Sequence, residues 1–338
     1  MTLNKLAAAT ALIAAMGLPI AGLAQTQPAG WTTKDGRWEN WKQGTFPNST
    51  AHFEALKAAA KGGVKHTITD IPDWSGLWTS ADSIPGASLG WGAPGVVLGW
   101  GLPTWRYDET NGLRAVTRSY GDPPPTPNSP QPEVPVFTTK GKERMIQILK
   151  DYEKGREWTS VHACLPAGFP RWHTEPFFKE FIVTPNQTWM VNELENEIRR
   201  IYTDGRGHLP EDEAYPLWEG DSIGFWDGDT LIIHTIHLRA GNWTTTQPEH
   251  SEQIETVEMA RKNAQGMIEI RMTVYDPVMF SKPWHLIFGS HLADLSKTPN
   301  ARIFQWACNE ENHIVKADDG TMKMLLPGDP GYAPAAPH

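Results

Sequence analysis

The second half of the chain consists of short segments in which apolar and polar residues alternate, separated by turn residues. This period of two begins near residue 176 and is typical of strands that bury one face. Asp227-Gly228 is the strongest hairpin signal, and residues 185–187 and 263–266 are further turns. Roughly nine short strands at regular spacing predict a mainly β fold, an antiparallel meander closed or nearly closed into a barrel, since closure removes exposed edges. We expect strands at residues 177–184, 188–194, 198–203, 222–226, 230–238, 253–261, 267–275, 284–292, 302–307 and 313–316.

The first half of the chain predicts two short helices and long Pro- and Gly-rich loops. Residues 52–61 have helical composition and end at a Gly pair, and residues 140–152 carry a wide apolar stripe. We therefore expect a signal peptide (1–24), an N-terminal extension with a short helix (25–70), one β-barrel domain (71–326) and a tail (327–338). The barrel domain includes an ordered loop (84–105), a Pro-rich wrap (121–136) and the helix within 138–155.

The N-terminus has the features of a secretory signal. Lys5 precedes an apolar run from Leu6 to Ile20, and small residues lead to a predicted cleavage after Ala24. The run is too short for a comfortable membrane span, which disfavours an uncleaved anchor, and no later segment reaches the ~18 apolar residues that a span needs. The sequence therefore predicts a secreted, periplasmic protein with no transmembrane segment after signal cleavage.

Export changes how the two cysteines are interpreted. In an oxidising compartment, Cys164 and Cys308 are expected to form a disulfide. The alternative is a catalytic Cys164 thiolate, for which the sequence shows no neighbouring base.

Charge and motifs exclude several classes of protein. The formal net charge of −9 disfavours nucleic-acid binding. No HExxH motif or His/Cys cluster with zinc spacing is present, so we predict no metal and no cofactor. The chain lacks the alternating helices of an α/β-hydrolase. The 16 Trp residues suggest either stacking surfaces or an apolar cavity.

Several histidines are candidate site residues. His234 and His237 are three apart on a predicted strand, so they project to opposite faces and do not chelate one metal together. His234 shares a face with Ile232 and Ile236, which predicts either a polar group in an apolar interior or a hydrogen-bonded core histidine. His250 lies at a strand edge after a polar loop and is our candidate general base.

The densest polar patch spans residues 199–208. Strand alternation places Arg200 and Tyr202 on one face and Arg199 on the other. The patch is interpreted either as a site that polarises a carbonyl or binds an anion, or as a turn with an Asp204–Arg206 ion pair and solvated arginines. Its candidate catalytic residues are Tyr202, Arg200, Arg206, Asp204 and His208.

Residues 218–229 contain Glu219, Asp221, Asp227 and Asp229 among tryptophans. Paired carboxylates beside Trp platforms suit a glycosidase. However, hairpin turns also require Asp-Gly pairs, so a structural role is the competing interpretation.

These motifs together resemble a family of exported proteobacterial proteins. The matching segments are PDWSGLW (72–78), CLPAGFPR (164–171), RRIYTDGR (199–206), WEGDSIG (218–224), DGDTL (227–231), PEHS (248–251), Asp276-Pro277 and Pro283-Trp284. The resemblance spans about residues 70–312 and carries over no activity. Members usually have Asp where this chain has His234, and a residue other than histidine at His237, so roles for these two imidazoles would be particular to this chain.

A looser similarity is to the lipocalin-like (calycin) barrels, through Gly76-Leu77-Trp78 at the first strand. In those barrels an Arg from a late strand packs over the Trp, and Arg302 is the candidate here. The similarity implies a lipocalin-like barrel that holds an apolar ligand.

Our first hypothesis is a periplasmic enzyme, a lyase, hydratase or hydrolase, that acts by acid–base chemistry on a hydrophobic or aromatic small molecule. Trp78, Trp218, Trp226 and His234 would line its cavity. The alternatives are a binding or transport barrel without turnover, and carbohydrate binding or cleavage. The sequence leaves the oligomeric state open.

Overall fold

The computed structural model describes 12 stretches of the chain, namely residues 41, 45–80, 104–116, 133–154, 159–175, 177–243, 246–264, 266–296, 299–307, 314–316, 322–325 and 329–331. The predicted signal peptide, Cys308, most of the 84–105 loop and most of the Pro-rich wrap lie outside them.

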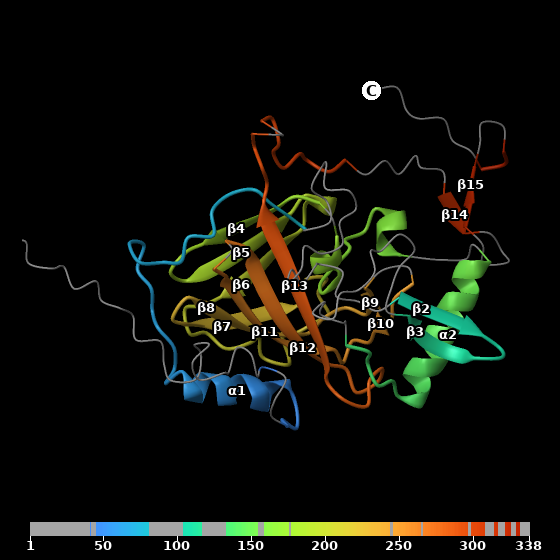
Figure 1. The fold of residues 1–338 in the computed structure, drawn as a ribbon, viewed down its shortest axis with the longest axis horizontal. Coiled ribbons are helices and arrows are strands. Elements are labelled where there is room, and N and C mark those ends of the chain that lie inside the picture. The colour runs from blue at the N-terminus through green and yellow to red at the C-terminus, as the bar shows by residue number, and fades with distance from the viewer. Residues whose placement is uncertain are drawn as a thin grey trace, which may run out of the picture.

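Nine strands form a closed barrel in the order β1-β13-β12-β11-β8-β7-β6-β5-β4, and β1 closes it by pairing with both β13 and β4. The barrel occupies the centre of the molecule (Figure 1). The mainly β barrel is thus confirmed and is consistent with a lipocalin-like barrel. Its strands are β1 (Trp78–Ser80), β4 (Lys179–Val183), β5 (Gln187–Asn192), β6 (Ile198–Tyr202), β7 (Asp221–Asp227), β8 (Thr230–Ile236), β11 (Glu255–Lys262), β12 (Ile268–Tyr275) and β13 (Trp284–Leu292).

The strand order corrects the predicted meander at one place. β6 and β7 are parallel, with Ile201 opposite Ser222 and Tyr202 opposite Ile223. A hairpin cannot connect parallel neighbours, because the chain must first return to the end at which β6 began. Residues 203–220 make this return.

The two predicted helices are α1 (Ser49–Ala59) and α2 (Thr139–Glu153), which begin slightly earlier than the sequence suggests. Each start is fixed by a side-chain cap, Asn48 on the Ala51 amide and Thr138 on the Gly141 amide. Neither helix is long and apolar enough to cross a membrane, and no other helix among the described residues is. The short elements are η2 (Ser160–Ala163), η3 (Arg171–Thr174), η4 (Leu194–Asn196), β9 (Gly241–Asn242), β10 (Glu249–His250), β14 (Ile314–Lys316) and β15 (Met322–Met324).

Two predictions for individual segments were wrong. Residues 302–307, expected as a strand, have no regular structure, and exposed Phe304 shows that this segment buries no continuous face. Residues 104–105, expected in a loop, begin the hairpin of β2 (Thr104–Asp108) and β3 (Gly112–Val116). This hairpin packs with α2 around Trp105, Met145 and Leu149.

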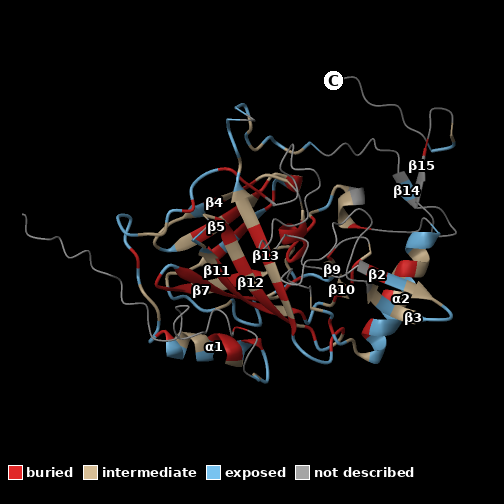
Figure 2. Cartoon of the chain, in the orientation of Figure 1, coloured by how far each residue is buried: buried red, intermediate tan, exposed pale blue. Residues whose placement is uncertain are grey.

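The two faces of the barrel wall have different surroundings. Most residues of β7 and β11 are buried (Figure 2), and large side chains pack together on the inward face. On β8, Leu231 and Ile233 belong to this inner cluster, whereas Ile232 belongs to an outer cluster with Phe53 of α1. His234 follows Ile232 outward and stacks on Phe53 with ring centroids 5.2 Å apart. His234 therefore does not line the barrel interior, as the cavity hypothesis required. It is instead the buried, hydrogen-bonded histidine of the competing interpretation, because α1 covers the outer face.

Candidate functional site

The structure does not bring the predicted acid–base residues together. His250 lies in the β9–β10 hairpin, edge-on to Trp243, whereas Tyr202 ends β6. Among the described residues no hydrogen bond or ring contact joins His250 to Tyr202, Arg200 or Arg206. Burial lowers the pKa of His250 to about 4, which makes it a weak base at neutral pH.

The polar patch on residues 199–208 is mostly a surface turn. Arg206 donates to both carboxylate oxygens of Asp204 and stacks over the Tyr202 ring at 4.2 Å. Arg200 points outward and lies 4.8 Å above the Trp189 ring. These contacts satisfy the arginines locally, and the Asp204–Arg206 pair is the turn ion pair considered from the sequence.

Two predicted residues, His208 and His234, do meet in a chain of polar contacts under α1. His208 Nδ1 lies 2.9 Å from Asp221 Oδ2, its Nε2 lies 2.9 Å from His234 Nδ1, and His234 Nε2 lies 2.9 Å from Ser49 Oγ. Ser49 in turn donates to Glu255. Four hydrogen bonds need four hydrogens. With both imidazoles neutral, one hydrogen each comes from His208, His234 and Ser49. All four contacts are therefore hydrogen bonds only when one further proton is bound.

The series of polar contacts from Asp221 to Glu255 has a structural role. Ser49 has no exposed surface, so its hydroxyl does not reach a substrate in this conformation. Burial, followed by the charge of His208, lowers the pKa of His234 to about 3. Burial opposes ionisation of Asp221, but its hydrogen bonds from His208 and the Leu209 amide lower its pKa. The chain therefore fastens α1 to β7, β8 and β11.

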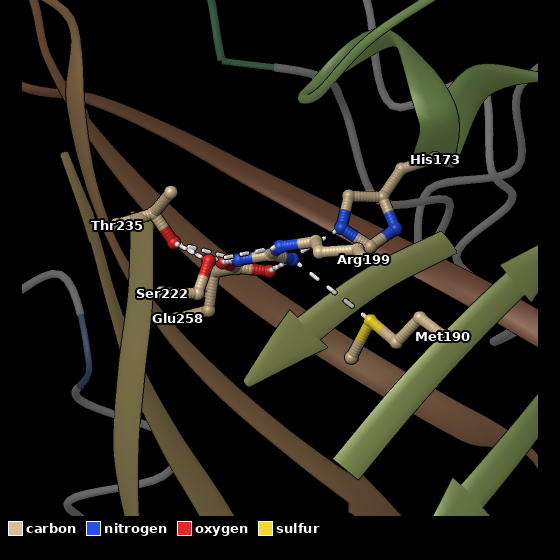
Figure 3. Close-up of polar contacts among 6 residues, drawn as sticks. All are labelled: His173, Met190, Arg199, Ser222, Thr235 and Glu258. Carbon is tan, nitrogen blue, oxygen red and sulfur yellow. Dashed lines mark hydrogen bonds and ion pairs between the residues drawn. The ribbon is translucent and has the colours of Figure 1, made fainter. Parts of the chain in front are cut away.

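A second polar network lies inside the barrel and is centred on Arg199 (Figure 3). Strand alternation predicted that Arg199 lies on the face opposite to the candidate residues Arg200 and Tyr202. Arg199 is fully buried and donates to Glu258 through Nη1 at 3.1 Å and Nη2 at 2.5 Å. It also donates to Thr235 Oγ1 at 2.7 Å and Ser222 Oγ at 3.3 Å, and lies 3.7 Å above the Phe169 ring.

The charges in this interior network are matched. Burial opposes ionisation of Glu258, but Arg199 and His173 outweigh it and lower the pKa of Glu258 to about 2. His173 Nε2 lies 3.3 Å from Glu258 Oε2, and burial lowers the pKa of His173. A buried ion pair whose donors are all satisfied is typical of a rigid core.

Ser222 lies in the pattern Gly220-Asp221-Ser222-Ile223-Gly224, which has the spacing of a hydrolase nucleophile elbow. The structure places Ser222 inside β7, where it bonds to Arg199 and Thr235. An elbow needs a sharp turn from strand to helix, so this serine is not one.

Glu197 and Glu219 are buried carboxyl groups near the same end of β6 and β7. Glu197 accepts from the Gly168 amide at 2.7 Å, and burial raises its pKa to about 7. Burial, followed by the charge of Glu197, raises the pKa of Glu219 well above its ordinary value. Burial therefore disfavours the ionised form of both carboxyl groups.

The tryptophans expected as cavity walls separate into two groups. Trp78 and Trp226 are fully buried in the packed core, and Trp74 lies edge-to-face with Trp226 at 5.4 Å. Trp218 is partly exposed, with Arg239 4.8 Å above its ring. Arg302 does not cover Trp78, since it lies over Phe304, and Lys262 lies 5.7 Å from the Trp78 ring instead.

The cavity that the described residues do form lies at one end of the barrel, between β4 and the strap, our name for residues 64–77. Val64 bridges to Trp226, His66 contacts the Gly228 carbonyl at 3.0 Å, and Lys262 donates to the Asp73 carbonyl at 3.3 Å. These contacts hold the strap across the end where β7 and β11 finish (Figure 1).

We call this cavity the mouth pocket. It is open to solvent and has a volume of about 600 Å³, within the range of small-molecule sites. Trp74 and Phe181, with ring centroids 5.8 Å apart, form buried aromatic walls, while Ile68 is 74% exposed and Ile182 is 45% exposed. The strap has no helical or strand periodicity, so only its PDWSGLW segment singled it out in the sequence. The lining residues are Ile68, Ile71, Pro72, Asp73, Trp74, Ser75, Gly76, Leu77, Glu180, Phe181, Ile182 and Val183.

Comparisons with protein-family models, with curated proteins and with solved structures found no match. The fold and the mouth pocket therefore define the chain only as a closed nine-strand barrel with a pocket at one end. The family resemblance on residues 70–312 stays a prediction. Cys164 is not a free thiol, but its predicted partner Cys308 lies outside the described residues, so the bond between them is also still a prediction.

Proposed function

We propose that this protein is a binding protein for an apolar small molecule, which it holds in the mouth pocket without turnover. The observation that carries the proposal is a pocket of about 600 Å³ with aromatic walls and with two isoleucines that remain largely exposed at its rim. Exposed apolar side chains around a concave surface are a common property of ligand sites. The predicted export of the chain would place this site in the periplasm.

The packed interior favours the mouth pocket over a ligand chamber inside the barrel. Trp74, Trp78, Trp172, Trp226 and Trp243 are each at most 1% exposed and fill the inner cluster. A ligand inside would have to displace these rings, at the cost of contacts that stabilise the core. The mouth pocket needs no such displacement.

The acid–base enzyme considered from the sequence has less support than binding. Its candidate base, His250, is buried and weakly basic, and its electrophilic partners lie on the outer surface around Tyr202. The series of contacts from Asp221 to Glu255 contains acid–base groups, but its hydroxyl group, on Ser49, has no exposed surface. Binding without turnover requires none of these groups.

The experiment is a titration with N-phenyl-1-naphthylamine, a neutral apolar probe whose fluorescence rises in apolar surroundings. Wild type is compared with Ile182→Asp, which places a charge at the rim of the pocket, and with the matched control Ile198→Asp on exposed β6. We expect Ile182→Asp to weaken binding about tenfold or more, because the probe would then desolvate a carboxylate. The control should bind like wild type. Equal loss in both variants, or in neither, would contradict the proposal.

A further inference from the structure

The side chains that line the mouth pocket carry a net negative charge. Its lining contains two carboxylates, Asp73 and Glu180, and no Lys, Arg or His. Among the described residues, Lys262 contacts the lining by donating to the Asp73 backbone carbonyl at 3.3 Å. One lysine against two carboxylates leaves the pocket negative.

Asp73 is held in position and kept ionised. Its Oδ1 accepts from the Ser75 amide at 3.0 Å and from the Ser75 hydroxyl at 2.6 Å. These hydrogen bonds, more than the charge of Lys262, lower the pKa of Asp73. Among the described residues, no hydrogen bond to its second carboxylate oxygen is seen.

Glu180 faces the same space from β4. It is half-buried, and among the described residues it has no hydrogen bond or ion pair. Its neighbour Phe181 turns toward Trp74 and packs edge-to-face with it. Glu180 and the exposed side chain of Ile182 are two apart on β4 and therefore share one face. A carboxylate beside exposed apolar side chains suits a ligand that joins a cationic group to an apolar body.

We infer that the ligand of the mouth pocket is an amphipathic organic cation, with an amine or quaternary ammonium group attached to an apolar body. The inference rests on the proposed binding function and adds the charge of the ligand to it. The apolar body contacts Ile68, Ile182 and the aromatic walls, and the cationic group lies near Glu180 and Asp73. Neutral and anionic molecules of the same shape bind more weakly.

The test uses three naphthalene probes that carry a trimethylammonium, a neutral or a sulfonate substituent. Each is titrated against the full chain at low salt by isothermal calorimetry. We expect the cation to bind about 5- to 10-fold more tightly than the neutral probe, and the sulfonate to bind most weakly. In about 0.5 M salt this preference should shrink while the affinity for the neutral probe holds.

Glu180→Gln assigns the preference to the pocket, and Glu143→Gln on exposed α2 is the matched control. We expect Glu180→Gln to remove most of the preference for the cation and to leave the neutral probe unchanged. Glu143→Gln should alter neither.

The outcomes separate this inference from the proposed function. If all three probes bind equally, and Ile182→Asp weakens all of them, the pocket binds apolar ligands and the inference about charge is overturned. If no probe responds to Ile182→Asp, the proposed function itself fails. If the cation binds but ignores both Ile182→Asp and Glu180→Gln, it is attracted only by the net charge of −9, which also overturns the inference.

Discussion

The barrel interior and the mouth pocket contain similar residue types, but they differ in whether the charged and apolar side chains have partners within the protein. In the interior, the buried charges of Arg199 and Glu258 are paired, and large aromatic rings pack together in the inner cluster. At the mouth, Glu180 has no ion pair with any described residue, and Ile68 and Ile182 remain exposed beside a cavity. Matched charges and close packing stabilise a fold, whereas unmatched groups around a cavity are available to a ligand. This difference supports the proposal that the mouth pocket binds a ligand while the interior stabilises the fold.

The largest expected effect concerns the interior pair. Arg199→Met leaves Glu258 buried without its cation, so the free energy of unfolding should fall by about 3–5 kcal/mol. Urea denaturation measures this loss. The double variant Arg199→Met/Glu258→Leu should recover most of it, because no unpaired charge then remains.

The same variant also tests the division of roles. Where the double variant is folded, its affinity for the neutral naphthylamine probe should match wild type. A folded double variant that no longer binds the probe would place the functional site inside the barrel and would contradict a binding site at the mouth pocket.

The second prediction is a pH dependence beneath α1. Burial, followed by the charge of His285, lowers the pKa of His52 from 6.5 to about 4. Since the folded pKa lies below the unfolded value, the stability that His52 contributes is present above pH 6.5 and is lost as the pH falls toward 4. The loss for this one group is at most about 3 kcal/mol.

The matched variant is His52→Gln. Unfolding free energies of both proteins at several pH values should converge as the pH falls from 7 to 4, because only wild type must protonate a buried imidazole. Parallel curves for wild type and variant would show that His52 is not buried in its neutral form.

The third prediction returns to the mouth. Ile68→Ala removes apolar surface that is 74% exposed, so the melting temperature should stay within about 1 °C of wild type. Affinity for the neutral probe should nevertheless fall about two- to fivefold, since part of this side chain contacts the ligand. A loss of stability together with unchanged affinity would mean that Ile68 packs and does not bind.

The smallest expected effect is at the surface turn. Asp204→Asn breaks the exposed contact with Arg206, and exposed ion pairs of this kind contribute little. Neither the melting temperature nor probe affinity should change measurably. A clear loss of binding would return the Tyr202 patch to the list of functional sites.

The sequence predicted those parts of the fold in which local pattern and tertiary packing agree. β13 occupies the predicted residues 284–292, and the Asp227-Gly228 turn joins β7 to β8. The parallel β6–β7 pair was missed because alternation specifies a strand but not the direction of its neighbour. For His234 the sequence left two interpretations open. The hydrogen-bonded core histidine fits the structure and the cavity-lining residue does not, because α1 buries an outer face that is as apolar as the inner one.

The candidate sites were harder to predict than the fold. Alternation separated Arg199 from Arg200 correctly, but it does not tell which face points inward, and the buried residue was Arg199. The mouth pocket joins residues 68–77 to residues 180–183, which are about a hundred positions apart. The strap has no period from which its contacts follow, so only the structure brings these two segments together.

Photoaffinity labelling reports where an apolar ligand lies without any substitution, so it tests directly whether the ligand binds in the mouth pocket. A neutral diazirine derivative of the naphthylamine probe is cross-linked to the full chain, with and without excess unlabelled probe, and the modified peptides are identified by mass spectrometry. If the ligand binds in the mouth pocket, we expect competable labelling on peptides that contain residues 68–77 and 180–183. Competable labelling confined to interior segments such as residues 169–174, or to the surface turn at residues 202–208, would contradict it.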